Sequence, residues 1–95
     1  MAKSKLQAAI EELQALAARQ DEEVFVYPAF GDNRSYKLTA MEPYLDLLIL
    51  TYESAGDVYT VETPKRQDFS FSKARLELHM VDSDGEGLLL VAEEA

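Results

Sequence analysis

The chain has 95 residues, of which 47% are hydrophobic and 28% charged, a formal net charge of -9 and no cysteine. This length and composition predict one globular domain, residues 1–95, and exclude a disordered chain. The absence of thiols excludes disulfides, cysteine nucleophiles and cysteine-based zinc sites, and the acidic charge disfavours direct binding to nucleic acid or to an anionic membrane.

The first twenty residues are typical of an amphipathic helix. Ser4 followed by Gln7 forms a capping box, in which each side chain can satisfy a backbone N–H at the helix start. Hydrophobic residues then recur at helical spacing on one face: Leu6, Ala9, Ile10, Leu13, Leu16 and Ala17. We expect this stripe to be a packing face, and because Glu11 and Glu12 interrupt the segment we expect neither a signal peptide nor a membrane span.

After Gln20 the hydrophobic pattern changes to the alternation that is typical of strands. We expect strands at residues 24–29, 35–39, 44–53, 58–63, 72–81 and 87–92, joined by turns and loops at residues 31–35, 41–43, 54–57, 64–68 and 82–87. Pro43 favours a connection because proline cannot donate to a strand ladder. The pattern predicts an α+β fold, with an N-terminal amphipathic helix packed on an antiparallel meander of about six strands.

The acidic stretch at residues 82–93 follows the spacing of a calcium-binding loop. Four of its residues match that pattern: Asp82, Asp84, Gly87 and Glu93. The flanking residues predict strands, whereas a calcium loop of this kind needs a helix on each side. We therefore interpret the stretch as a hairpin turn, and we keep Asp82, Asp84 and Glu86 as weak candidate ligands for a divalent ion.

Groups that carry catalysis are sparse in this sequence. His79 is the single histidine and falls on the polar face of a predicted strand, with no nucleophile motif nearby. The adjacent carboxylates Glu22 and Glu23 point to opposite faces if they lie in a strand, so they do not form an acid–base pair. No glycine-rich phosphate loop occurs. We expect neither enzymatic activity nor a cofactor.

The predicted strands carry more hydrophobic surface than one helix can cover. In residues 44–53 the face with Leu48 and Leu50 and the face with Leu47 and Ile49 are both apolar, which is typical of a strand covered on both sides. One helix is about 10 Å wide, whereas six strands span about 29 Å. The rest could be covered by curling of the sheet, by a second copy or by an unrelated partner, and we expect a twofold homodimer.

These surfaces and the acidic charge favour a protein partner. The residues expected to contact it are Tyr44, Leu48, Leu50, Tyr52, Asp21, Glu22 and Glu23. Carboxylates on such a surface suit a basic protein surface, either directly or by imitating nucleic acid, although an acidic surface can also serve solubility alone. We expect a cytoplasmic, non-catalytic binding module that sequesters or inhibits another protein, as phage-encoded inhibitors and immunity proteins do.

Two other functions remain open at this stage. The first is a structural or assembly subunit, and the second, less favoured, is a calcium-binding loop protein. The order of a helix followed by strands on a small acidic chain resembles type III secretion chaperones, which are acidic dimers that bind effector segments. The resemblance covers the order of elements only, because the later helices of that family are missing, and it implies a dimer and a protein partner without assigning site residues.

Overall fold

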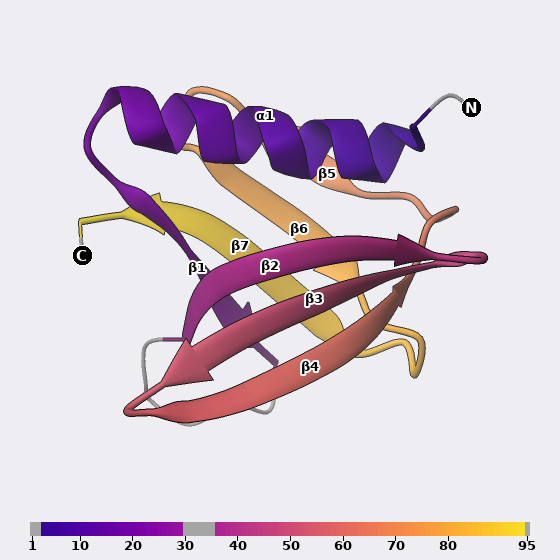
Figure 1. Ribbon diagram of the computed structural model, residues 1–95. Coiled ribbons are helices and arrows are strands. Elements are labelled where there is room, and N and C mark those ends of the chain that lie inside the picture. Colours follow the sequence, from indigo (N-terminus) through magenta and orange to yellow (C-terminus); the bar gives the residue numbers. More distant parts are fainter. Residues whose placement is uncertain (1–2, 30–35, 95) are drawn as a thin grey trace.

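The computed structural model describes residues 3–29 and 36–94, which form one α-helix and seven β-strands (Figure 1). The elements are α1 (Lys5–Arg19), β1 (Glu23–Pro28), β2 (Tyr36–Tyr44), β3 (Leu47–Ser54), β4 (Asp57–Pro64), β5 (Ser70–Ser72), β6 (Glu77–Val81) and β7 (Gly87–Glu93). All the strand pairs among these residues are antiparallel, so the α+β prediction is confirmed, with seven strands in place of six. The turn predicted at residues 31–35 lies outside the described residues.

Helix α1 forms as its sequence predicts. The Ser4 hydroxyl oxygen accepts a hydrogen bond from the Gln7 backbone N–H at 3.1 Å, which confirms the N-cap. The apolar stripe is buried and packs against β1, β7 and β6: Leu6, Ala9, Ile10, Leu13 and Ala17. In the described part of the chain, no helix has the length and hydrophobicity needed to cross a bilayer.

The sheet contains two meanders that meet at its centre. Its strand order is β4-β3-β2-β1-β7-β6-β5, so β1 to β4 form one run, β5 to β7 form the other, and β1 pairs with β7. Strands β4 and β5 follow one another in the chain but occupy opposite edges of this sheet. The meander predicted from the sequence is therefore present as two consecutive pieces.

The sheet curls until its two edges approach each other. Six Cα-to-Cα steps from Pro64 to Ser70 reach at most about 22 Å, whereas the edges of a flat seven-stranded sheet lie about 29 Å apart. Hydrogen bonds across the gap confirm the closure. The Ser83 N–H donates to the Glu62 carbonyl at 2.9 Å, and the Gln67 side chain bonds both the N–H and the carbonyl of Val81, at 2.8 and 2.9 Å.

This curling encloses the hydrophobic core. Leu48 and Leu50 on the inner face of β3 are 0% exposed and belong to the same cluster of buried residues as the helix stripe. Thr63 is also buried, and its hydroxyl donates to the Leu48 carbonyl at 2.8 Å. One copy of the chain thus buries this face of β3 by curling of the sheet, which was the first of the three ways considered from the sequence.

Strand β2 and the turn after it differ from the prediction. Residues 41–43 continue β2, in which Pro43 pairs with Leu48, and the turn lies at Leu45 and Asp46. The predicted strand 44–53 therefore begins only at Leu47. Among the described residues β1 pairs with β2 only near Tyr36, so beyond that point β2 has no neighbour on one side and can accept a residue without an N–H.

The predicted strand at residues 72–81 is a hairpin instead. Strand β5 ends at Ser72, residues 73–76 form a turn, and β6 begins at Glu77. The Ser72 hydroxyl oxygen accepts from the Arg75 N–H at 3.2 Å, which stabilises the turn. Leu76 has a φ of 53° and is 8% exposed, so the alternation of buried residues extends into the turn, and this is why the pattern looked like one long strand.

Candidate functional site

The outer face of strands β2 to β4 carries hydrophobic side chains that the core does not use. Tyr44 is 59% exposed and Leu45 is 77% exposed, in a turn where its φ of 54° is unusual for leucine. Leu47 and Ile49 point away from the core on β3 and are partly exposed. These four residues are called the outer patch below. Pro64 extends it, because it pairs with Leu47 on the far side from Tyr44.

Carboxylates flank the outer patch within the sheet. Ile49 lies between Glu42 of β2 and Glu62 of β4 in the strand register, so the three side chains share one row of the outer face. Both glutamates are exposed. The next outward position on β3 is the polar Thr51, so the hydrophobic area ends there. The patch therefore has an acidic border along the strands.

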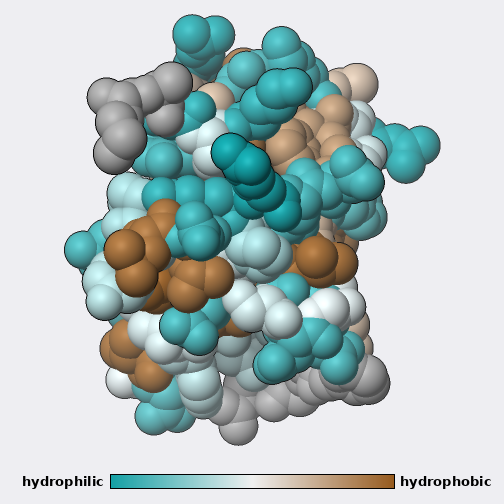
Figure 2. Space-filling model, turned by 90° about the vertical axis from the view of Figure 1, so that its right-hand side faces the viewer, coloured by the Kyte–Doolittle hydropathy of each residue, from teal (hydrophilic) through white to brown (hydrophobic). Residues whose placement is uncertain are grey.

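Basic side chains border the patch at its other end. Lys3 and Lys5 at the start of α1 lie near Lys65 and Arg66 after β4, although sixty residues separate them in the chain. Leu45 lines a groove together with Lys3, Lys65 and Arg66, so it marks the boundary between the hydrophobic and basic areas. Figure 2 looks at this end of the molecule and shows hydrophobic areas interrupted by hydrophilic side chains.

The acidic segment expected to contact a partner lies elsewhere. Asp21 and Glu22 lie between α1 and β1, and Glu23 is the first residue of β1, at the opposite end of the molecule from the β2–β3 turn (Figure 1). The Glu23 carboxylate pairs with the Lys37 ammonium at 2.9 Å, and this hydrogen bond raises the pKa of Lys37. The structure therefore does not bring the acidic segment and Tyr44 together in one site.

The other predicted contact residues lie on the inner side of the sheet. Leu48 and Leu50 are fully buried in the core, so neither can contact a partner in this fold. Tyr52 packs against the core and lines a cavity. The alternation in the sequence identified both faces of the strand, but it could not tell which face the helix and the curled sheet would cover. It therefore missed Leu47 and Ile49.

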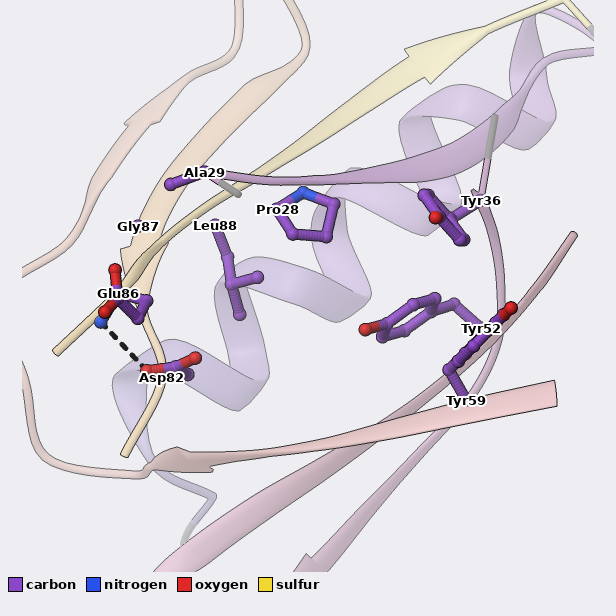
Figure 3. Close-up of a pocket in the computed structure, with 9 residues that line it drawn as sticks. All are labelled: Pro28, Ala29, Tyr36, Tyr52, Tyr59, Asp82, Glu86, Gly87 and Leu88. Carbon is purple, nitrogen blue, oxygen red and sulfur yellow. Dashed lines mark hydrogen bonds between the residues drawn. The ribbon is translucent and has the colours of Figure 1, made fainter. Parts of the chain in front are cut away.

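The cavity beside Tyr52 is lined by three tyrosines and two carboxylates (Figure 3). Its volume is about 310 Å³. The Tyr36 ring is nearly perpendicular to the Tyr52 and Tyr59 rings, with centroids 5.4 and 5.6 Å away. Tyr52 and Tyr59 stack at 5.7 Å with an angle of 21°. Asp82 and Glu86 lie across the cavity from these rings.

The candidate metal-binding residues and the single histidine that the sequence analysis named lie in a hairpin turn and on an exposed strand surface. Asp82 begins the turn between β6 and β7, and its Oδ1 accepts from the N–H groups of Asp84 and Glu86, each at 2.9 Å, which confirms the predicted hairpin turn. Within residues 3–29 and 36–94 no three metal-ligating side chains are gathered. His79 is exposed on β6, with its Nε2 3.9 Å from the Glu77 carboxylate.

A second hydrophobic area lies on the outer face of β1 and β7. Phe25 pairs with Val91, Tyr27 pairs with Leu89, and all four side chains are partly exposed. The Tyr27 hydroxyl donates to the Glu93 carboxylate, four residues further along β7. The Tyr27 side chain therefore extends along the strands and covers part of this area.

The Tyr52 hydroxyl gives a test of the cavity at alkaline pH. Burial, then the nearby Tyr59 and Asp82, raise the pKa of Tyr52 above its usual value of 10.0. The folded state thus favours the protonated phenol, and this contribution to stability is present below about pH 10 and is lost as the pH rises through the raised pKa.

We expect the free energy of unfolding to fall above pH 10, and to fall less steeply in Tyr52→Phe. Urea unfolding at pH 9 and pH 11 measures both slopes. Lys37 titrates in the same range because its pKa is also raised, so the comparison between variants isolates Tyr52. Tyr44→Phe, which removes an exposed hydroxyl, is the control. Equal slopes for Tyr52→Phe and the unmodified chain would contradict the assignment.

Three surfaces thus remain as candidates: the outer patch with its acidic and basic borders, the tyrosine-lined cavity, and the shielded area on β1 and β7. The outer patch is the candidate that best suits a protein interface, because it exposes Tyr44 and Leu45, which are adjacent in the sequence. Comparison of the chain with protein-family models, with curated proteins and with solved structures found no significant match.

Proposed function

We propose that this chain is a non-catalytic protein-binding module whose outer patch docks on a partner protein with a basic surface. The observation that carries this proposal is the outer patch itself. Tyr44 and Leu45 are 59% and 77% exposed, and Leu47 and Ile49 are left out of the core. Contiguous exposed hydrophobic groups with a polar rim are typical of protein interfaces.

The shape and chemistry of the patch favour a protein over a small ligand. Small ligands bind in concave pockets, whereas the outer patch lies on a strand face and its turn. An exposed tyrosine beside leucine is the type of anchor that dominates binding energy at protein interfaces. Occupying a functional surface of the partner in this way is sufficient to sequester or inhibit it.

The charges favour a basic partner. Glu42 and Glu62 border Ile49 directly, and the whole chain carries a net charge of -9. A basic surface would be attracted over a long range and would place its cations opposite these carboxylates. Exposed pairs of this kind contribute modest affinity, so the hydrophobic anchors supply most of the binding energy.

A second copy of the chain is the second candidate occupant. A twofold axis through Leu45 and Leu47 would place the acidic border of one protomer opposite the basic border, Lys65 and Arg66, of the other. The chain would then be an assembly subunit. Light scattering distinguishes the two proposals, because a single copy has a mass of 10.7 kDa and a homodimer twice that value.

The role of the acidic border can be tested by removing its charge without changing its shape. We expect Glu42→Gln combined with Glu62→Gln to weaken partner binding about tenfold, and we expect binding by the unmodified chain to weaken by a similar factor in about 0.5 M salt. The measurement is capture from a lysate of the native host, followed by titration of the captured protein.

Asp21→Asn combined with Glu94→Gln is the matched control, because it removes the same charge at the far end of the molecule. We expect this control to bind like the unmodified chain. Loss of binding in the control with retention in the Glu42 and Glu62 variant would move the site to the acidic segment after α1. Capture of an acidic protein that tolerates salt would also contradict the proposal.

A further inference from the structure

The tyrosine-lined cavity is a second potential binding site, separate from the outer patch. Tyr52 and Tyr59 belong to the inner face of β3 and β4, whereas the outer patch is on the outer face. The β6–β7 turn lines the other side of the cavity with Asp82 and Glu86 (Figure 3). The site is therefore built from segments far apart in the sequence, which the curling of the sheet brings together.

Three aromatic rings form one wall of this cavity. Two of the rings are nearly parallel, and Tyr36 stands at 86° and 84° to them. The three rings therefore pack against one another along this wall. Aromatic faces attract cations whose centre lies within about 6 Å of the ring. Within the described residues the hydroxyl groups of Tyr52 and Tyr59 make no hydrogen bond, whereas Tyr36 has a partner.

Two carboxylates supply negative charge across from the rings. Asp82 uses its Oδ1 to hold the turn, which fixes the carboxyl group in place and leaves its second oxygen available. Glu86 is exposed, and its backbone N–H is held by the same Oδ1. The negative charge of Asp82 contributes to the raised pKa of Tyr52, so the carboxylate faces the phenol across the cavity. The described lining contains no basic side chain that would neutralise them.

We propose that this cavity binds a guanidinium group. A guanidinium is flat, stacks on aromatic rings and pairs with carboxylate oxygens through several donors at once, so it matches a site with rings on one side and carboxylates on the other. The volume of about 310 Å³ accommodates such a group with part of its alkyl chain. The source is either a free guanidinium compound or an arginine side chain of another protein.

This proposal goes beyond the docking function and is tested on the chain alone. Three of the five tyrosines line the cavity and the chain has no tryptophan, so tyrosine fluorescence reports mainly on this site. We expect N-acetyl-arginine amide to change the fluorescence and the amide NMR shifts of residues 82–88 with saturation in about the millimolar range. N-acetyl-citrulline amide, which has the same shape without the charge, should not bind.

Glu86→Gln is the decisive variant because its side chain is exposed and its loss should not disturb folding. We expect it to weaken binding about three- to fivefold, while Glu94→Gln, the same change at an exposed position outside the cavity lining, leaves binding unchanged. Tyr59→Leu should weaken binding about fivefold. If that variant fails to fold, Glu86→Gln still decides the question.

Agmatine and a Gly-Arg-Gly peptide distinguish the two sources of the guanidinium. Binding of both supports recognition of an arginine side chain, and binding of agmatine alone supports a free small molecule. Equal binding of the citrulline and arginine probes, no saturable response to any guanidinium, or unchanged affinity in Glu86→Gln would each overturn the proposal. None of these outcomes depends on the outer patch or its partner.

Discussion

Leu50→Asp is expected to unfold the chain. Leu50 is 0% exposed on the inner face of β3, within the cluster that also contains the helix stripe. The substitution would remove a buried hydrophobic side chain and place an unpaired carboxylate in the core, with a cost of about 4 kcal/mol or more. That is close to the whole stability of many small domains. Circular dichroism and urea unfolding measure the effect.

Ile49→Lys is the matched control for this effect, because it places a charge on the opposite face of the same strand. Ile49 lies between Glu42 and Glu62, so the new ammonium has two carboxylates beside it. We expect the chain to stay folded, with a free energy of unfolding within about 1 kcal/mol of the original. If Leu50→Asp folded normally while Ile49→Lys unfolded, the assignment of the inner and outer faces would be reversed.

The same Ile49→Lys variant is expected to lose its protein partner. It removes a hydrophobic side chain from the outer patch, at the acidic border, and partly neutralises that border with one change. Hydrophobic anchors at protein interfaces commonly contribute about 2 kcal/mol or more, and an unpaired cation facing a basic surface adds a further penalty. We expect affinity to fall about 100-fold, measured by titration of the captured partner against the purified variant.

Ala15→Lys is the control for this prediction. Ala15 is exposed on α1, so the change adds the same positive charge at a position outside the outer patch. We expect it to bind the partner within about threefold of the unmodified chain, because distant exposed charges are largely screened. Equal loss of affinity in Ala15→Lys and Ile49→Lys would mean that net charge alone governs binding, and the outer patch would lose its role.

Local sequence signals predicted most of the elements. The Ser4 cap and the hydrophobic stripe from Leu6 to Ala17 predicted helix α1 correctly, because capping and helical spacing depend only on neighbouring residues. The Ala55–Gly56 turn falls within the predicted turn at 54–57, and both residues have positive φ, at 53° and 86°. The alternation at β6 correctly placed His79 on the polar face of its strand, where it is exposed.

Features that depend on distant parts of the chain could not be predicted. Pro43 is accepted within β2 because β1 pairs with only a short part of that strand, which no local pattern reveals. The pairing of β1 with β7, and the curling that it allows, also depends on residues far apart in the sequence. That curling covers Leu48 and Leu50, and so it removes the reason for expecting a dimer that buries them.

Of the two candidate sites, the outer patch depends mainly on neighbouring residues and was indicated by the sequence, whereas the cavity depends on distant residues and was not. The sequence indicated surplus hydrophobic surface on residues 44–53, and the structure places part of it, Leu47 and Ile49, outside the core. It gave no sign of the tyrosine-lined cavity, because Tyr36 and Tyr59 are on different strands from Tyr52 and meet only through the register of the sheet. The apolar residues at outward strand positions and in the turn between β2 and β3 could be detected in the sequence. The convergence of three tyrosines from three strands could not.

Site-specific cross-linking tests the docking surface most directly. The chain has no cysteine, so a single introduced cysteine can carry a photoreactive group at one chosen position. Leu47→Cys places that group in the outer patch, and Leu89→Cys places it in the shielded area on β7. After illumination in a host lysate, we expect Leu47→Cys to form a discrete adduct with a basic protein and Leu89→Cys to form none. Adducts from Leu89→Cys alone, or the same adducts from both positions, would contradict the outer patch as the docking surface.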